Sequence, residues 1–258
     1  MNIPKAIFFD VDGTLLINGQ LLESTKDALW YARDKGVLLF LATGRHKEEL
    51  KKIEWMPGFT FDGIVSLNGG YCYVDEHVIY KNPVCKEAVR MVVDYITHKN
   101  NSACMFCEEQ DMYINIVNEE VKAIHAALDL SIPTICNPAR AIDADVFQMV
   151  TFRNGLGNDF LAKLPNCHLT SWAEGCYDIV PTSTNKWAGI LHMINHFGIS
   201  SDDVAAIGDS QNDIEMLKHA AYSVAMGNGI DEVKEHADYV TGHAENNGIL
   251  QAIKYLLG

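Results

Sequence analysis

Short apolar runs alternate with amphipathic segments at both ends of the chain. These runs are too short and too rich in β-forming residues for helices, so they predict buried strands at 6–9, 37–42, 64–67 and 204–207. The amphipathic segments predict helices at 24–35, 46–54, 186–197, 212–219, 230–236 and 246–257. Strands that alternate with helices are typical of an α/β fold with a parallel sheet.

Residues 82–181 follow a different pattern. Helices are predicted at 86–98, 119–128 and 159–164, and strands at 103–108, 112–116, 146–152, 168–171 and 177–180. Hairpin-like links between these strands favour an α+β layer with an antiparallel sheet. We therefore expect a core made of 1–81 and 182–258, with 82–181 inserted into it as a separate α+β domain.

Two acids follow the first predicted strand. In extended backbone, the i, i+2 spacing of Asp10 and Asp12 places both side chains on the same side, and Asp12-Gly13 then turns the chain. Neighbouring carboxylates repel each other unless a cation lies between them, which indicates a hard divalent metal. Taken alone, the segment is as typical of an ordinary strand followed by an Asp-Gly turn as it is of a metal site.

A second acidic loop, Gly208-Asp209-Ser210-Gln211-Asn212-Asp213, follows the predicted strand 204–207. One of its polar residues could be a simple helix N-cap. Capping does not require two Asp and an Asn around a Gly, however. The two acidic loops therefore suggest that they converge on one ion.

Two further segments carry groups that bind phosphate. Thr43-Gly44-Arg45 follows a strand, and its hydroxyl and exposed amide can hold a phosphate oxygen, although most such tripeptides are only turns. Lys186 lies in the first turn of a helix, where the helix dipole disfavours a cation. A lysine held near acids and a phosphate would explain this placement; the alternative is a solvated surface lysine.

The order Asp10-x-Asp12-Gly13-Thr14, Thr43, Lys186 and Gly208-Asp209-x-x-Asn212-Asp213 resembles the four motifs of the haloacid dehalogenase-like superfamily. Leu67-Asn68-Gly69-Gly70 and the long insertion after it resemble the Cof-type phosphatases with a type-2 cap. The resemblance implies a Rossmann-like doubly wound core and a substrate-specificity cap. Ser210 and Trp187 depart from the usual Asn and Gly, which places substrate choice in question but removes no charged catalytic group.

The resemblance also implies the chemistry: Mg²⁺-dependent hydrolysis of small phosphorylated metabolites through an aspartyl-phosphate. Asp10 would be the nucleophile and Asp12 the general acid and base. Asp10, Asp209 and the backbone carbonyl of Asp12 would bind Mg²⁺, with Asp213 as a ligand or as a support for one. The phosphoryl oxygens would be held by Thr43, Gly44, Lys186 and Asn212. Sugar phosphates are the first expectation, with flavin mononucleotide and pyridoxal phosphate as alternatives.

Net charge, apolar run length and cysteine content restrict the partners and the cellular location that we expect. A net charge of −14 argues against a nucleic-acid partner, and no apolar run reaches the length of a membrane span. Seven cysteines without framework spacing favour reduced thiols and a cytoplasmic protein. We interpret Cys104 and Cys107 as core thiols rather than a redox pair, and His46 as a surface position rather than part of the site. The oligomeric state cannot be inferred.

Other functions use similar residues. A sugar phosphomutase of the same superfamily would keep every motif and differ only in its products. In a receiver-like signalling domain, the Asp that becomes phosphorylated follows a middle strand, whereas Asp10 follows the first predicted strand. A catalytically inactive binding protein would be expected to lack at least one of Asp10, Asp12, Lys186 and Asp209. A haloacid dehalogenase proper needs neither Asp12 nor a metal cluster.

Overall fold

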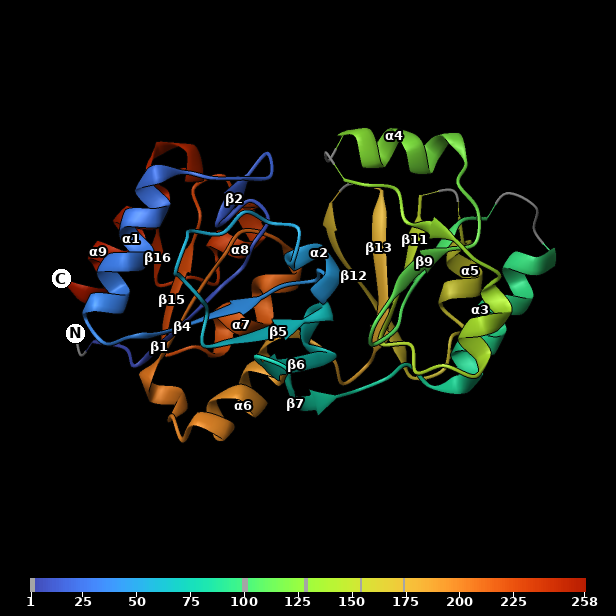
Figure 1. The fold of residues 1–258 in the computed structure, drawn as a ribbon, viewed down its shortest axis with the longest axis horizontal. Helices are drawn as coiled ribbons and strands as arrows, with labels where there is room; N and C mark the ends of the chain where they lie inside the picture. The colour runs from blue at the N-terminus through green and yellow to red at the C-terminus, as the bar shows by residue number, and fades with distance from the viewer. Residues whose placement is uncertain (1–2, 99–101, 128–129, 154, 174) are drawn as a thin grey trace. The chain divides into compact units, whose positions relative to one another are not determined.

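The computed structural model describes the chain except residues 1–2, 99–101, 128–129, 154 and 174. It divides into two compact units (Figure 1). The first contains Met1–Arg45, Lys51–Tyr80 and Asn185–Gly258, and the second contains His46–Leu50 and Lys81–Thr184. The middle of the chain thus forms a unit of its own, and the short segment His46–Leu50 belongs with it.

The first unit is built on an eight-stranded sheet of the order β16-β15-β14-β1-β4-β5-β6-β7. All neighbours from β16 to β5 are parallel, and β6 pairs antiparallel with β5. The strands are β1 (Ala6–Phe9), β4 (Leu38–Ala42), β5 (Gly63–Ser66), β6 (Tyr71–Val74), β7 (His77–Lys81), β14 (Val204–Gly208), β15 (Tyr222–Ala225) and β16 (Tyr239–Val240). From β1 the chain builds outward to β4 and β5, and after the insertion it builds from β14 on the other side. Strand β1 is therefore the switch point at which α/β sheets bind ligands.

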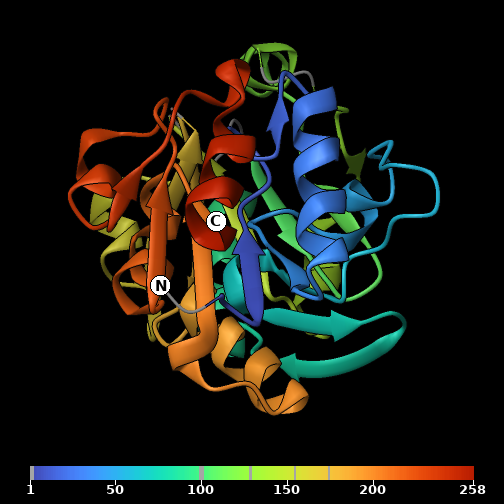
Figure 2. The same cartoon turned by 90° about the vertical axis from the view of Figure 1, so that its left-hand side faces the viewer.

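Helices cover both faces of this sheet. Phe8 and Phe40 stack and pack against Met193 of α6 (Lys186–Phe197) and Leu217 of α7 (Ile214–His219). By the two-residue period of a strand, the buried Ile7 faces the opposite side. Helices α1 (Glu23–Asp34) and α9 (Gly248–Leu257) pack against each other, and α1 also contacts β4. Figure 2 shows this unit from the side of the two chain ends.

Shorter elements complete the first unit. They are the hairpin β2 (Leu16–Ile17) and β3 (Gln20–Leu21), and the single-turn helix α8 (Asp231–Lys234). The hairpin turns at Asn18 and Gly19, which both have positive φ angles (49° and 72°). Asn-Gly is the preferred pair for such a turn, so this was a hairpin signal that our sequence analysis missed.

The second unit has a six-stranded sheet of the order β10-β9-β8-β11-β13-β12. Its strands are antiparallel apart from the short β9–β10 pair. They are β8 (Cys104–Cys107), β9 (Met112–Ile114), β10 (Thr134–Ile135), β11 (Gln148–Phe152), β12 (Cys167–Ala173) and β13 (Cys176–Pro181). Its helices are α2 (Lys47–Leu50), α3 (Lys86–His98), α4 (Glu119–Ala127) and α5 (Asn158–Leu161). Val92 of α3 and Val121 of α4 belong to separate apolar clusters with the sheet.

The predicted α/β class, with a parallel core sheet and an antiparallel second sheet, is confirmed. Helix α3 has the predicted bounds. The helix predicted at 46–54 was wrong beyond Leu50, because the chain instead turns toward Pro57 and the edge-to-face packing of Trp55 on Phe61. The helix predicted to begin at residue 24 begins one residue earlier, at Glu23. Leu22 occupies its N-cap position without a side-chain hydrogen bond.

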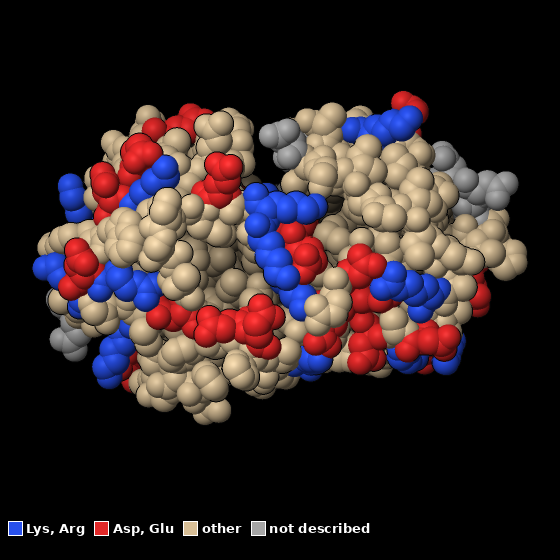
Figure 3. All heavy atoms as spheres, in the orientation of Figure 1, with Lys and Arg blue, Asp and Glu red and all other residues tan. Residues whose placement is uncertain are grey.

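The surface carries charges of both signs on each unit (Figure 3), although acids outnumber bases 34 to 20 over the chain. In the part of the chain that the structure describes, every helix is too short or too polar to cross a membrane.

Candidate active site

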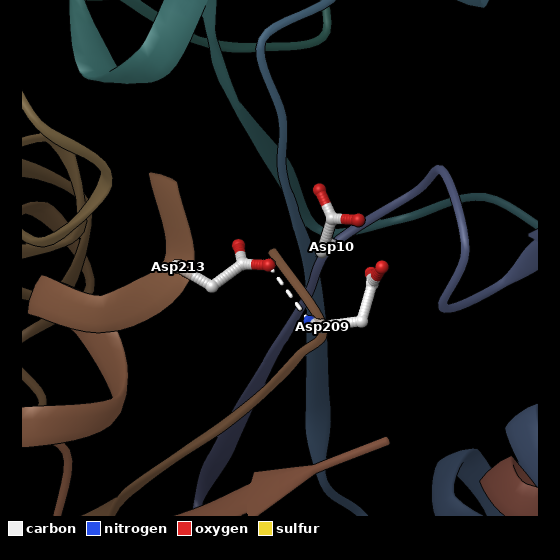
Figure 4. Close-up of side chains that lie close together, drawn as sticks. All are labelled: Asp10, Asp209 and Asp213. Atoms are coloured by element: carbon white, nitrogen blue, oxygen red, sulfur yellow. Dashed lines mark hydrogen bonds between the residues drawn. The ribbon is translucent and has the colours of Figure 1, made fainter. Parts of the chain in front are cut away.

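The site lies where β1, β4 and β14 end, within the first unit. Asp10 follows β1, Thr43 follows β4 and Asp209 follows β14, so parallel pairing alone brings these three residues to one edge. Carboxylate oxygens of Asp10, Asp209 and Asp213 lie within 4.8 Å of one another (Figure 4). The two acidic loops that are far apart in the sequence do converge.

Lys186 is the cation of this cluster. Its Nζ donates hydrogen bonds to Oδ1 of Asp10 (2.5 Å) and Oδ1 of Asp213 (2.6 Å), and its side chain is fully buried. The helix that carries it is started by Asn185, whose side chain accepts from the Ala188 amide. The alternative of a solvated surface lysine is therefore wrong. Burial lowers the pKa of Lys186, but the two carboxylates outweigh it and the pKa is raised.

Asp213 is bound on both of its oxygens. Oδ1 accepts from Lys186, and Oδ2 accepts from the amides of Asp209 (2.8 Å) and Ser210 (2.9 Å). Figure 4 shows the bond to Asp209. The fit is tight, since a Cβ on Gly208 would lie 2.5 Å from Cγ of Asp213. Asp213 thus orients both Lys186 and the loop that presents Asp209.

The pKa values of the other two acids, Asp10 and Asp209, are raised. Burial raises the pKa of Asp10 well above its usual value; Lys186 lowers it in part, while Asp213, Asp209 and Asp12 raise it further. Burial and Asp213 raise the pKa of Asp209 to about 7, against hydrogen bonding from Thr14, whose hydroxyl donates to Oδ1 of Asp209 at 2.7 Å. Such shifts mark a site where like charges are held together.

The carboxylates can accommodate a divalent cation. Oδ2 of Asp10 is buried and has no hydrogen-bond partner among the described residues, and carboxylate oxygens are the preferred ligands of Mg²⁺. A cation would also oppose the burial and the carboxylate repulsion that together raise the pKa of Asp10 and Asp209. Gly13 keeps space beside Asp209, because a Cβ there would lie 2.4 Å from Oδ2.

Polar groups for an anion surround the cluster. Thr43 is buried, and its hydroxyl accepts from the Arg45 amide at 3.1 Å, while Gly44 follows it at the end of β4. The side-chain Nδ2 of Asn212 donates to Oδ1 of Asn68 (2.9 Å). Sequence reasoning gave no role to Asn68, which is buried in a turn at φ 55°. The sequence signal for Asn68 was its place in the segment Leu67-Asn68-Gly69-Gly70. An Asn beside two glycines is typical of a turn with positive φ, which Asn tolerates better than most side chains.

Asp12 is held by a partner that the sequence analysis did not assign. Arg45 donates from Nε to Oδ2 of Asp12 (2.7 Å) and from a terminal nitrogen to Oδ1 (2.6 Å). Both side chains are only partly exposed, 17% for Arg45 and 31% for Asp12. The second acid of the first motif is thereby fixed in a two-point pair.

Comparison with known proteins shows the family. Residues 7–253 match the model of the haloacid dehalogenase-like hydrolases. The chain belongs to this hydrolase family. The solved structure of BT4131, a sugar phosphatase of subclass IIB, superposes with a TM-score of 0.85 at 35% identity, over 97% of this chain and 98% of that one.

Two further relatives agree with this assignment. A structure from work on a trigonal-bipyramidal intermediate in a phosphoryl-transfer superfamily has a TM-score of 0.87 at 33% identity, with 98% of both chains covered. The 5-amino-6-(5-phospho-D-ribitylamino)uracil phosphatase YwtE of Bacillus subtilis is 26% identical, again over 98% of both chains. The resemblance to the Cof-type phosphatases is confirmed, and the chain is a phosphatase of the haloacid dehalogenase-like type.

Three residues that the sequence left ambiguous, His46, Cys104 and Cys107, lie in the second unit. His46 is buried, not on the surface: Nε2 lies 2.8 Å from the Glu108 carbonyl oxygen, and Nδ1 accepts from the Glu48 amide at 3.2 Å. These contacts suit the neutral Nε2–H tautomer. Cys104 and Cys107 are buried in β8 as free thiols, and burial raises the pKa of both.

Proposed function

We propose that this phosphatase hydrolyses small phosphorylated metabolites, sugar phosphates first among them, with Mg²⁺ and through an aspartyl-phosphate on Asp10. The observation that carries the proposal is the buried cluster in which Lys186 bridges Asp10 and Asp213 beside Asp209. A buried carboxylate with one oxygen on an ammonium group, and with no hydrogen bond to the other from any residue that the structure describes, suits a nucleophile that meets an incoming phosphoryl group.

Asp10, Asp209 and the backbone carbonyl of Asp12 are the proposed Mg²⁺ ligands. Both oxygens of Asp213 are taken by Lys186 and two amides, so we assign it the supporting role rather than that of a ligand. When bound, Mg²⁺ would lower the repulsion between the acids and a doubly charged phosphate. Lys186 would remain close enough to share the charge of the phosphoryl oxygens.

In the first step, an oxygen of Asp10 attacks phosphorus while the bond to the leaving oxygen breaks, and Asp12 gives its proton to that oxygen. In the second step, Asp12 as a carboxylate takes a proton from water, whose oxygen attacks phosphorus and frees Asp10. Thr43, the Gly44 amide, Lys186 and Asn212 would hold the phosphoryl oxygens as negative charge develops. The pairing of Asn212 with Asn68 supports a fixed orientation for this amide.

The second unit, His46–Leu50 and Lys81–Thr184, which contains the predicted insertion 82–181, is proposed to select the substrate. The relatives support the choice of substrate class only by analogy: BT4131 is a sugar phosphatase, and YwtE acts on a phosphorylated ribityl compound. Flavin mononucleotide and pyridoxal phosphate remain alternative substrates. Seven free cysteines favour a reducing, cytoplasmic setting, and we propose no nucleic-acid or membrane partner.

A screen of phosphorylated metabolites for phosphate release tests the proposal. It should be run with Mg²⁺, with Mg²⁺ removed by a chelator, and with the Asp10→Asn variant. We expect release from sugar phosphates only in the first condition. Full activity after chelation would contradict the metal, and full activity of Asp10→Asn would contradict the nucleophile. A product that keeps its phosphate at a new position would indicate a phosphomutase instead.

A further inference from the structure

Arg45 is held by hydrogen bonds through both its backbone and its side chain, which is 17% exposed. Its amide donates to the Thr43 hydroxyl (3.1 Å), and its carbonyl accepts from the Ser66 hydroxyl (2.8 Å) and the Leu67 amide (3.3 Å). Its guanidinium binds both oxygens of Asp12. The end of β4, the end of β5 and the loop after β1 are thus joined through one residue.

The geometry points to a role in the reaction. We propose that Arg45 is a positioning residue that holds the Asp12 carboxyl group in the plane it needs as acid and base; this rests on the proposed function of Asp12. Each carboxylate oxygen has two lone pairs, and the Arg45 fork occupies one on each. The remaining lone pairs can carry the proton that goes to the leaving oxygen and later receive the proton from water, without breaking the Arg45 contact.

If Arg45 positions Asp12, its loss should slow the reaction of one class of ester more than that of another. An alkyl phosphate needs a proton on its leaving oxygen, whereas nitrophenolate leaves without one, so loss of Asp12 orientation should slow phosphorylation of Asp10 by the alkyl ester more. A misplaced catalytic group costs up to about 100-fold in rate. In single-turnover measurements, we expect Arg45→Ala to lose about 10- to 100-fold with a sugar phosphate and less than about 3-fold with nitrophenyl phosphate.

Two more variants separate orientation from charge. Arg45→Lys keeps the charge but cannot form the two-point pair, so it should stay impaired with the alkyl ester. Arg45→Ala combined with Asp12→Asn should be no slower than Asp12→Asn alone, because the two residues act through one group. Arg33→Ala is the matched control: Arg33 also binds a carboxylate, that of Asp62, through two hydrogen bonds of 2.9 Å, but away from the site.

Equal losses with both esters, full rescue by Arg45→Lys, or additive losses in the double variant would overturn the inference while leaving the phosphatase proposal intact. A crystal structure of Arg45→Ala supplies a test that needs no turnover. Several orientations of the Asp12 carboxyl group would support positioning by Arg45, and a single unchanged orientation would refute it. A wild-type protein that releases no phosphate would instead count against the proposed function.

Discussion

Lys186 and Asp10 are 176 residues apart in the sequence, yet Nζ of the lysine lies 2.5 Å from Oδ1 of the aspartate, and both are buried. The lysine occupies the first turn of a helix, against the preference of the helix dipole. Its placement is explained by Asp10 and Asp213, which supply the opposite charge. The pair therefore links the carboxyl end of β1 to the first residue of α6 and sets the charge around the proposed nucleophile.

Removing the ammonium group should destabilise the metal-free protein. In Lys186→Met, two buried carboxylates lose their counter-charge, and breaking one side of a buried pair costs about 3–5 kcal/mol. Urea unfolding should show this loss, and Mg²⁺ should recover part of it. Lys218→Met, which removes an exposed lysine paired with Glu215, is the control and should change stability by less than about 1 kcal/mol. A Lys186→Met protein as stable as this control would contradict the assignment.

Substitutions of Asp10 and of Asp12 should block different steps of the reaction. Asp10→Asn removes the proposed nucleophile, so no phosphorylated protein should form. Asp12→Asn removes the acid and base, so phosphorylation by nitrophenyl phosphate should persist while dephosphorylation stalls, with a loss in turnover on the order of 10²–10⁴-fold. Rapid quench with labelled substrate distinguishes the two. Label trapped on Asp10→Asn would mean that the nucleophile is assigned wrongly.

Divalent cations should stabilise the protein through Asp209. Binding to the folded state alone adds about 2.7 kcal/mol at a Mg²⁺ concentration 100 times the Kd. Asp209→Asn should lose this gain, and its metal-free form should be more stable than the wild type because the repulsion among the acids falls. Asp231→Asn removes a fully exposed acid and should keep the whole Mg²⁺ effect. Equal Mg²⁺ effects in both variants would exclude Asp209 as a ligand.

Protonation of His46 at acid pH should lower the free energy of unfolding. Burial lowers its pKa below the ordinary 6.5, only partly offset by the Glu108 carbonyl. Folding therefore favours neutral His46, and this contribution is complete above about pH 6.5 and is lost as the pH falls below it. The stability difference between wild type and His46→Gln should shrink from pH 7.5 to pH 5.5.

Comparing the two proteins cancels other titrating groups, including Asp209, whose raised pKa acts in the opposite direction. The exposed His77 supplies the control variant, His77→Gln. Urea unfolding at each pH measures the free energies. If the difference in unfolding free energy between the wild type and His46→Gln stays constant from pH 7.5 to pH 5.5, the folded protein does not favour the neutral form of His46.

The sequence by itself determined the order of the elements and the edge at which Asp10, Thr43 and Asp209 meet. Local hydrophobic periods specify strands and helices, and parallel strands place their carboxyl ends together whatever the details of packing. The two acidic loops followed from the same patterns, whereas the assignment of His46–Leu50 to the second unit did not. Their chemistry depended on residue types and order, which are written directly in the chain.

Only the tertiary structure decided which partner each polar group has. The bonds of Thr14 to Asp209, Asn212 to Asn68 and Arg45 to Asp12 span 195, 144 and 33 residues. Burial of Lys186 and His46 depends likewise on what packs over them. Such contacts depend on strand register, loop conformation and side-chain orientation together, and a displacement of one or two ångströms breaks them. No local pattern encodes that geometry, because the cost of leaving each group unpaired arises only when the fold excludes water.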